Sequence, residues 1–168
     1  LGDVYKRQTL AHSLDFDDTH AEASLHASAP ILPAVLAAAQ LKKATGKEIV
    51  TAIALGYEIH IRLGKAIDAG DHYRRGFHPT ATCGIFAAAA AGGKVLDLSS
   101  DQYISSFGIA LSQTAWAMQF LIDGSWTKRL HVGQAAQNGL IASVMAGDNF
   151  KGPANSLEGK WGFFRNYA

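Results

Sequence analysis

The stretch between Pro79 and Lys94 carries Ile85 and Phe86, followed by five consecutive alanines. Alanine is the strongest helix former, and its small side chain lets neighbouring helices approach closely. Alanine and the 17 glycines together make up more than a quarter of the 168 residues. The sequence therefore favours helices packed at short backbone distances, with one of them beginning near Pro79.

Two segments before this stretch also place apolar residues at helical spacing. Ser28 is a plausible N-cap, with Pro30 in the first turn and Gly46 as the stop of the first helix. The second helix is expected from about Lys47 to Ala66. It is apolar on most sides, which predicts that it is buried.

The second half of the chain continues the pattern. Ser99 and Gln102 have the spacing of a capping box, which predicts a helix that continues toward Phe120. A further helix is expected over about 133–146, and the Gly-rich, aromatic tail 150–168 indicates a loop or an interface. No alternating strand pattern of useful length is present, so we expect an all-α fold of helical hairpins with short loops.

Composition excludes several classes of protein. The chain is 48% hydrophobic and 17% charged, which suits a sizeable core, and its formal charge of +1 gives no basic field for a nucleic acid. Cys83 is the single cysteine, so the chain holds no internal disulfide, four-cysteine zinc site or all-cysteine iron–sulfur cluster. The longest apolar run, 85–91, is far shorter than the roughly 20 residues of a membrane span. With no secretory leader pattern visible, we expect a cytoplasmic protein without a membrane anchor.

Residues 1–8, Leu-Gly-Asp-Val-Tyr-Lys-Arg-Gln, fit poorly with the rest of the chain. They are typical of adapter bases translated at the start of a sequencing fragment. We expect them to be a non-native leader, and the remaining residues 9–168 to be a piece of a longer protein.

An acidic segment, Asp15-Phe16-Asp17-Asp18-Thr19, matches D-x-D-x-T, the nucleophile loop of haloacid-dehalogenase-type phosphatases. That loop needs a buried parallel strand before it, and residues 9–14 make a weak strand. A calcium loop is disfavoured because the central glycine is missing. An acidic turn or helix start is the plain alternative.

Two basic segments indicate an anion site. Residues 74–80, Arg-Arg-Gly-Phe-His-Pro-Thr, join two arginines and His78 to a helix start, where free N–H groups can bind an anion. Lys128 and Arg129 are expected just before a helix, against the macrodipole preference, so a bound anion explains them better than packing of the lysine stem. A solvated loop remains open for the first segment, and His26 fits either a cleft or the surface.

Together these segments suit a small polyanionic substrate and acid–base chemistry. The histidines form no HExxH motif and no close pair at ligand spacing, so we expect no metal. Glu58 and His60 lie on the second expected helix and are interpreted as structural.

The order of the motifs D-F-D-D-T-H, L-H-x-S-A-P, G-F-H-P-T and T-K-R-L-H-x-G resembles the MmgE/PrpD family, as does the closing stretch K-G-P to L-E-G with G-F. The resemblance extends from about residue 12 to the end of the chain. It implies a large all-helical domain, of which 9–168 would be a part, a smaller lid domain that is absent here, and a homodimer. It also implies that no metal or organic cofactor is used.

The resemblance, matched motif by motif, assigns the candidate site residues. The catalytic candidates are Asp15, His26, His78 and Lys128, and the candidates for substrate binding are Thr19, Thr80 and Arg129. One departure is Ala27, where the family usually has proline. Because the absent lid supplies further residues, including a tyrosine, we expect this chain alone to be inactive.

The implied function is a cofactor-independent lyase or isomerase that acts beside a carboxylate of a small di- or tricarboxylate. Lys128, Thr19 and N–H groups near Thr80 would stabilise the developing charge, while His78 or His26 moves the proton. Asp15 would orient a histidine or hold it protonated.

The leading candidate reaction is 2-methylcitrate dehydration, a carbon–oxygen lyase reaction, with cis-aconitate decarboxylation and iminodisuccinate epimerisation as alternatives. A phosphatase and a non-catalytic helical scaffold remain open from other classes. The observation that distinguishes these alternatives is whether the candidate residues converge on one cleft.

Overall fold

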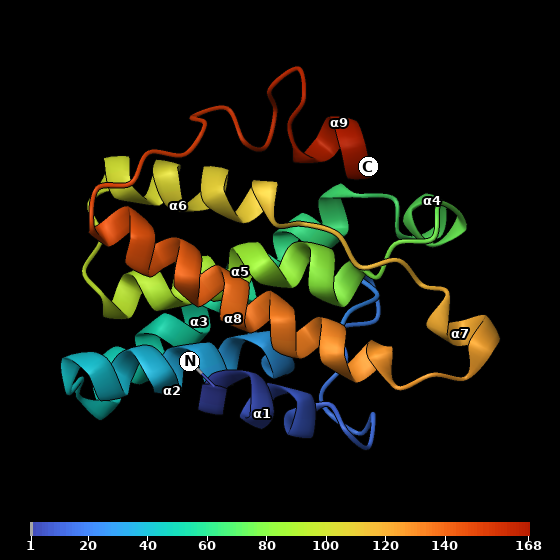
Figure 1. Cartoon of the computed structure of the whole chain (residues 1–168), viewed down its shortest axis with the longest axis horizontal. Helices are drawn as coiled ribbons and strands as arrows, with labels where there is room; N and C mark the ends of the chain where they lie inside the picture. The colour runs from blue at the N-terminus through green and yellow to red at the C-terminus, as the bar shows by residue number, and fades with distance from the viewer. Residues whose placement is uncertain (1) are drawn as a thin grey trace.

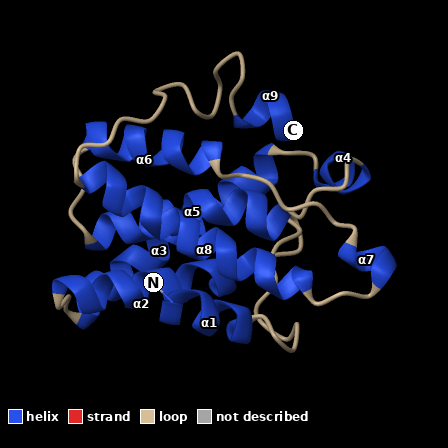
Figure 2. Ribbon diagram, in the orientation of Figure 1, coloured by secondary structure: helices blue, strands red, loops and turns tan. Residues whose placement is uncertain are grey.

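The computed structural model describes residues 2–168, and every regular element in that range is a helix (Figure 2). The helices are α1 (Gly2–Ala11), α2 (Ser28–Lys42), α3 (Gly46–Ala66), α4 (Ala69–Arg74), α5 (Pro79–Val95), α6 (Ser100–Ser112), α7 (Phe120–Asp123), α8 (Thr127–Gly147) and α9 (Phe163–Tyr167). Extended pairing among the described residues is limited to two isolated bridges, His20 with Leu25 and Phe77 with Ala117. The all-α prediction is confirmed.

Helix α5 is the centre of the fold, in contact with α2, α3, α6 and α8 (Figure 1). All of its residues except Lys94 are buried. The alanine run makes this possible, because a helix surrounded on all sides must present small side chains wherever a neighbour comes close. Two apolar clusters lie on either side of it, one around Phe86 and Phe163 and the other around Ile31 and Val35.

The contact between α5 and α8 shows how close the backbones come. A Cβ placed on Gly139 would lie 2.5 Å from the carbonyl oxygen of Ile85 and 2.7 Å from the Cβ of Ala88. No side chain fits at this crossing. The close packing that the glycine and alanine content predicted is therefore present between α5 and α8.

Most helix starts agree with the sequence, but the ends of the first expected helix differ. Helix α2 is preceded by Ala27, not capped by the Ser28 side chain, and it ends at Lys42, followed by left-handed Lys43. The Ser28 N–H group donates instead to the Asp18 carboxylate at 3.1 Å. The cap therefore comes from ten residues earlier, which local spacing cannot reveal. Gly46 begins α3 and does not stop α2.

The capping box at Ser99 and Gln102 is present, but the helix it starts ends at Ser112 and does not reach Phe120. Helix α8 begins at Thr127, earlier than the expected 133, so Lys128 and Arg129 lie in its first turn and do not precede it. The helix dipole disfavours cations in that turn, and contacts with residues of the loop after α1 compensate for them.

Helix α3 is less buried than its apolar pattern predicted. The residues buried along it are Ala52, Gly56, His60, Leu63 and Gly64, which form one face. The opposite face carries exposed Val50 and the exposed pair Glu58 and Arg62. The helix therefore forms the outside of the bundle and not its centre.

The tail beyond Phe150 forms a loop that leads to α9 and packs back on the bundle, as Figure 1 shows. Phe163 is fully buried against Phe86, with ring centroids 5.0 Å apart. Arg75 donates hydrogen bonds to the carbonyl oxygens of Asn166 and Ala168. This segment closes one side of the core.

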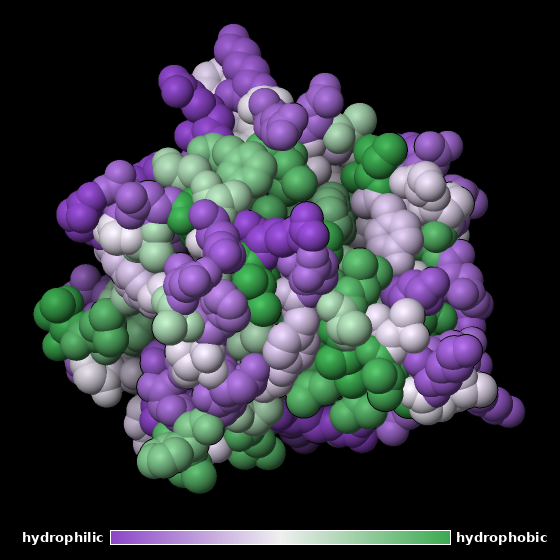
Figure 3. Space-filling view, turned by 180° about the vertical axis from the view of Figure 1, so that it is seen from behind, coloured by the Kyte–Doolittle hydropathy of each residue, from purple (hydrophilic) through white to green (hydrophobic). Residues whose placement is uncertain are grey.

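Hydrophobic side chains also reach the surface, where Figure 3 shows several apolar patches separated by hydrophilic groups. Nothing in the structure identifies what contacts them, so the homodimer stays a prediction. Across the described residues, each helix is too short or too polar to cross a membrane. Residue 1 lies outside the described range and 2–8 form the start of α1, so the non-native leader also remains a prediction.

Candidate functional site

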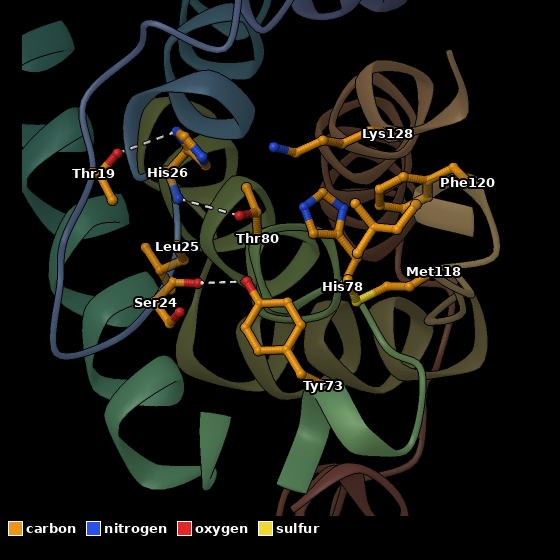
Figure 4. Close-up of a pocket in the computed structure, with 11 residues that line it drawn as sticks. Thr19, Ser24, Leu25, His26, Tyr73, His78, Thr80, Met118, Phe120 and Lys128 are labelled. Atoms are coloured by element: carbon orange, nitrogen blue, oxygen red, sulfur yellow. Dashed lines mark hydrogen bonds between the residues drawn. The ribbon is translucent and has the colours of Figure 1, made fainter. Parts of the chain in front are cut away.

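A pocket of about 210 Å³ opens at the end of the bundle where α5 and α8 begin, beside α7. Its wall comes from four parts of the chain: the loop before α2, the α4–α5 region, α7 and the first turn of α8. The lining residues are Thr19, Ser24, Leu25, His26, Tyr73, His78, Thr80, Met118, Phe120, Leu121 and Lys128. Five of the seven residues predicted from the sequence are among them (Figure 4).

The acidic segment 15–19 follows helix α1 through a turn, not a parallel strand. The strand that a haloacid-dehalogenase-type nucleophile loop requires is thus absent from the described part of the chain. Asp15 has a left-handed backbone, with φ of 58°, a conformation that aspartate tolerates better than most residues. Asp18 accepts hydrogen bonds from the Ser28 N–H group and the Tyr57 hydroxyl, so it holds the segment in place.

Asp15 does not line the pocket itself but is paired with a residue that does. The Lys128 ammonium donates to Oδ2 of Asp15 at 2.5 Å. Partial burial acts to raise the pKa of Asp15, but the hydrogen bond and charge of Lys128 outweigh it and the pKa lies below its ordinary value. The carboxylate therefore stays ionised and holds the lysine at the edge of the pocket.

His26 is fixed by contacts on three sides. Its backbone N–H group donates to the Thr80 hydroxyl at 3.2 Å, and its ring Nδ1 lies 3.5 Å from the Thr19 hydroxyl (Figure 4). Its Nε2 lies 3.5 Å from Oδ1 of Asp15. His26 thus brings the predicted residues Asp15, Thr19 and Thr80 together around one side chain.

His78 immediately precedes α5, with Pro79 at the first helical position. Its side chain is almost fully buried beside Phe120 and His131, with ring centroids 5.6 Å and 5.8 Å away. Burial, followed by the nearby charges of His131 and Lys128 among others, holds the pKa of His78 well below its ordinary value. The imidazole is therefore neutral near neutral pH, and its ring N–H group can donate a hydrogen bond.

Arg129 is the predicted residue that lies apart. It is not among the residues that line the pocket, and its Nε donates to the Ser13 carbonyl oxygen at 2.6 Å. It forms a separate hollow with Thr9, Leu10 and Trp126. Neighbours on a helix point in different directions, and here Lys128 takes the direction of the pocket.

Several residues at the site were not predicted from the sequence. Tyr73, Met118, Phe120 and Leu121 also line the pocket, and no local signal marks them because α4 and α7 reach the pocket only through tertiary packing. His12 and Asp17 lie behind His26, with His12 Nδ1 2.8 Å from a carboxylate oxygen of Asp17. The five-residue spacing of a histidine and an aspartate in one loop was the available signal.

Donor atoms of His12, Asp15, Asp17 and His26 lie within 4.8 Å of one another, close enough to surround a cation. Histidine nitrogens and carboxylate oxygens are ordinary transition-metal ligands. The Lys128 ammonium already supplies a positive charge to Asp15 in this cluster. The negative charge of Asp15 is therefore balanced by Lys128 and does not require a metal ion. The absence of a metal stays a prediction.

The lining of the pocket thus combines a cation, hydroxyl groups and two imidazoles with the apolar side chains of Leu25, Met118, Phe120 and Leu121; Figure 4 shows Lys128 and His78 beside Phe120, across from Thr19 and His26. An ammonium and hydroxyl donors suit a carboxylate, and imidazoles suit proton transfer. The arrangement can bind a small anion and move a proton on it.

Comparison with known proteins identifies the family. The family model for the MmgE/PrpD N-terminal domain matches residues 8–168. A cis-aconitate decarboxylase from Aspergillus terreus is 36% identical over 155 residues, covering 89% of this chain and 31% of that protein. The human cis-aconitate decarboxylase is 35% identical over 162 residues, covering 94% of this chain and 33% of that protein. A cis-aconitate decarboxylase-like protein from Aspergillus oryzae is 33% identical over 159 residues, covering 90% and 33%. The chain spans about a third of the length of these relatives, and it belongs to the MmgE/PrpD family.

Proposed function

We propose that this chain forms part of the active site of a cofactor-independent carboxy-lyase that acts on a small di- or tricarboxylate. The convergence of Lys128, His26 and His78 on one pocket carries this proposal. These residues come from three separate segments of the chain. A cation and two histidines gathered in one cavity are typical of a functional site and are not needed for a scaffold without catalytic function.

In this proposal the Lys128 ammonium and the Thr19 and Thr80 hydroxyls bind carboxylate oxygens of the substrate. When the bond to one carboxylate breaks, CO2 leaves and the electron pair moves onto the remaining carbon skeleton. A neighbouring carboxylate shares the resulting charge, which the ammonium stabilises. A histidine then donates a proton to carbon, so the products are CO2 and a protonated, unsaturated acid.

The two histidines have different surroundings, which suggests different roles. His26 lies between the carboxylates of Asp15 and Asp17 and lines the pocket, so it is placed to deliver a proton. His78 is buried and neutral, so it is placed to donate a neutral hydrogen bond. Decarboxylation needs one proton donor, and His26 fits that need better.

The choice of substrate rests on the relatives. Dehydration of 2-methylcitrate was the leading expectation from the sequence, whereas the Aspergillus terreus and human relatives carry the name cis-aconitate decarboxylase. We therefore place cis-aconitate first, and treat dehydration of 2-methylcitrate and epimerisation of iminodisuccinate as alternative reactions of the same pocket. Because relatives are about three times longer, we propose activity for the full-length protein, as a homodimer, and none for this chain alone.

Product analysis of the full-length protein tests the proposal. The purified protein is incubated separately with cis-aconitate, 2-methylcitrate and iminodisuccinate, and products are followed by proton NMR with trapping of CO2. We expect CO2 and the matching unsaturated dicarboxylate from cis-aconitate. A variant with a changed surface residue on the outer face of α3, Arg62→Gln, serves as the control for substitution in general and should keep the wild-type rate. Turnover of 2-methylcitrate without release of CO2 would reassign the protein as a dehydratase, and no turnover of any of the three would refute the proposal.

A further inference from the structure

A histidine outside the predicted set lies directly behind the pocket. His12 follows α1, and its side chain is 0% exposed although Leu10 and Leu14 beside it are largely exposed. The centroid of its ring lies 4.7 Å from that of His26 and 6.4 Å from that of His78. His12 therefore contacts the pocket histidines from the protein side, where substrate cannot reach it.

Asp17 holds the inner edge of this histidine. Nδ1 of His12 lies 2.8 Å and 2.9 Å from the two carboxylate oxygens of Asp17, whose side chain is 8% exposed. An ionised carboxylate only accepts hydrogen bonds, so Nδ1 carries the proton and donates it. Moving an imidazole and a carboxylate out of water is costly unless they pair, so each side chain fixes the other.

Asp17 also faces His26. Its Oδ2 lies 3.4 Å from Nδ1 of His26, while Nε2 of His26 lies 3.5 Å from Oδ1 of Asp15. Nε2 of His12 lies 3.4 Å from the same Asp15 oxygen. The side chains of His12, Asp17, His26 and Asp15 thus form a closed cycle, the histidine–aspartate ring, in which His26 is the member that lines the pocket.

We propose that His12 is a positioning residue: it fixes the Asp17 carboxylate, and through Asp17 it sets the orientation and the tautomer of His26. A negative charge beside one ring nitrogen favours the proton on that nitrogen, and the Asp17 carboxylate can act in this way on Nδ1 of His26 only if it is itself held. The consequence for rate rests on the proposed function. The contacts among these side chains are independent of the proposed function, because they involve only residues of this chain.

Two substitutions at His12 separate positioning from simple packing. His12→Phe keeps a ring of similar size but removes the donor to Asp17. His12→Asn is smaller but places an amide N–H near the position of Nδ1 and keeps that donor. If His12 acts through Asp17, the asparagine variant retains more activity than the phenylalanine variant. If His12 only fills space, the order is reversed.

Kinetics of the full-length protein with cis-aconitate give the first readout. We expect His12→Phe and Asp17→Asn to lower kcat on the order of 10- to 100-fold, because a small misplacement of a reacting group has an effect of this size. KM should change little, since neither residue lines the pocket. A wild-type kcat in both variants, or a loss confined to KM, would overturn the proposal.

Side-chain nitrogen NMR gives a second readout that needs no substrate. Long-range proton–nitrogen spectra report which nitrogen of each histidine carries the proton. We expect His12 protonated at Nδ1 in the wild type, and a changed tautomer or shifted nitrogen signals for His26 in His12→Phe and Asp17→Asn. Changed His26 signals in a protein that does not turn over cis-aconitate would support the positioning role and refute the proposed function alone. Unchanged His26 signals in both folded variants would refute the positioning role.

His72 provides the matched control. It is also 0% exposed, and its ring nitrogens bond the Tyr167 carbonyl oxygen at 2.6 Å and the Thr82 hydroxyl at 2.8 Å, outside the histidine–aspartate ring. We expect His72→Phe to lower the melting temperature while kcat of the folded protein and the His26 signals stay at wild-type values. An equal change of the His26 signals in His72→Phe would mean that loss of any buried histidine disturbs the site, and would overturn the specific role of His12.

Discussion

The ammonium of Lys128 lies 2.5 Å from Oδ2 of Asp15, a residue 113 positions earlier in the chain. Lys128 stands in the first turn of α8, where the helix dipole disfavours a cation. The Asp15 carboxylate offsets that cost and directs the ammonium toward the pocket. This contact, together with that of Arg129 with the Ser13 carbonyl oxygen, joins the loop after α1 to the start of α8 beside the candidate site.

Replacing Lys128 tests its role in charge stabilisation. We expect Lys128→Ala in the full-length protein to lower kcat for cis-aconitate on the order of 10²-fold or more, because the developing charge loses its nearest cation. Steady-state decarboxylation kinetics measure the effect. Lys47→Ala, at an exposed lysine near the start of α3, is the matched control and should be silent. A near-normal rate in Lys128→Ala would remove the lysine from the site.

His78→Ala tests the buried imidazole. We expect a loss in kcat on the order of 10²-fold, because the pocket loses a buried, fixed hydrogen-bond donor for the developing charge. The deletion leaves a ring-sized space next to Phe120, so added imidazole should restore part of the rate. Failure of imidazole to restore any activity, with the fold intact by circular dichroism, would assign His78 to packing instead of chemistry.

Stability should fall as the solution is acidified below pH 6.5. Burial lowers the pKa of His60 to about 4, and that of His131 also to about 4, whereas unfolded histidine titrates near 6.5. Between these values the unfolded chain binds protons that the folded chain does not, so the free energy of unfolding decreases as pH falls through this window. For fully buried His60 the loss approaches about 3 kcal/mol at pH 4.

Urea unfolding between pH 7.5 and pH 4.5 measures this dependence. His60→Leu should flatten it, because the variant has no buried imidazole to charge at this position, and pH 7.5 serves as the reference where the imidazole is neutral in both states. An unchanged slope in His60→Leu would show that other groups control the acid sensitivity.

Gly139→Ala tests the helix crossing. The added methyl would lie 2.5 Å from the Ile85 carbonyl oxygen, on backbone that cannot move without separating α5 from α8. We expect a loss of stability of about 1–3 kcal/mol, measured as a lower urea midpoint. Gly46→Ala is the matched control: no atom lies within 4 Å of its added methyl, so it should gain a few tenths of a kcal/mol or stay neutral. Equal midpoints for the two variants would contradict the close approach of α5 and α8.

Treatment with a chelator tests the prediction that no metal takes part. Because Lys128 supplies the positive charge at Asp15, prolonged dialysis of the full-length protein against EDTA should leave its decarboxylation rate unchanged. Elemental analysis before and after dialysis shows whether a metal was removed. Activity that is lost and then restored by a divalent cation would contradict the prediction and make the four side chains of the histidine–aspartate ring the candidate ligands.

The sequence by itself determined the local features of this protein. The alanine run predicted the central helix α5, the spacing of Ser99 and Gln102 predicted the cap of α6, and the motif order predicted the family. Each of these depends on residues close together in the chain, where periodicity, propensity and capping decide the outcome. The same local signals misplaced the ends of α2 and α6 and the start of α8. At the starts of α2 and α8, contacts with Asp18, Asp15 and Ser13 from the loop after α1 stabilise the first turn.

Only the tertiary structure decided which side chains meet. Helix packing turned Lys128 toward Asp15 and left Arg129 on a different surface, although the two cations are neighbours in the sequence. It buried His78 and His12, whose one-dimensional context did not distinguish a surface histidine from a buried one. The reason is physical: the helix period fixes the direction of a side chain relative to its neighbours, but only the way in which whole helices cross decides which atoms lie in that direction.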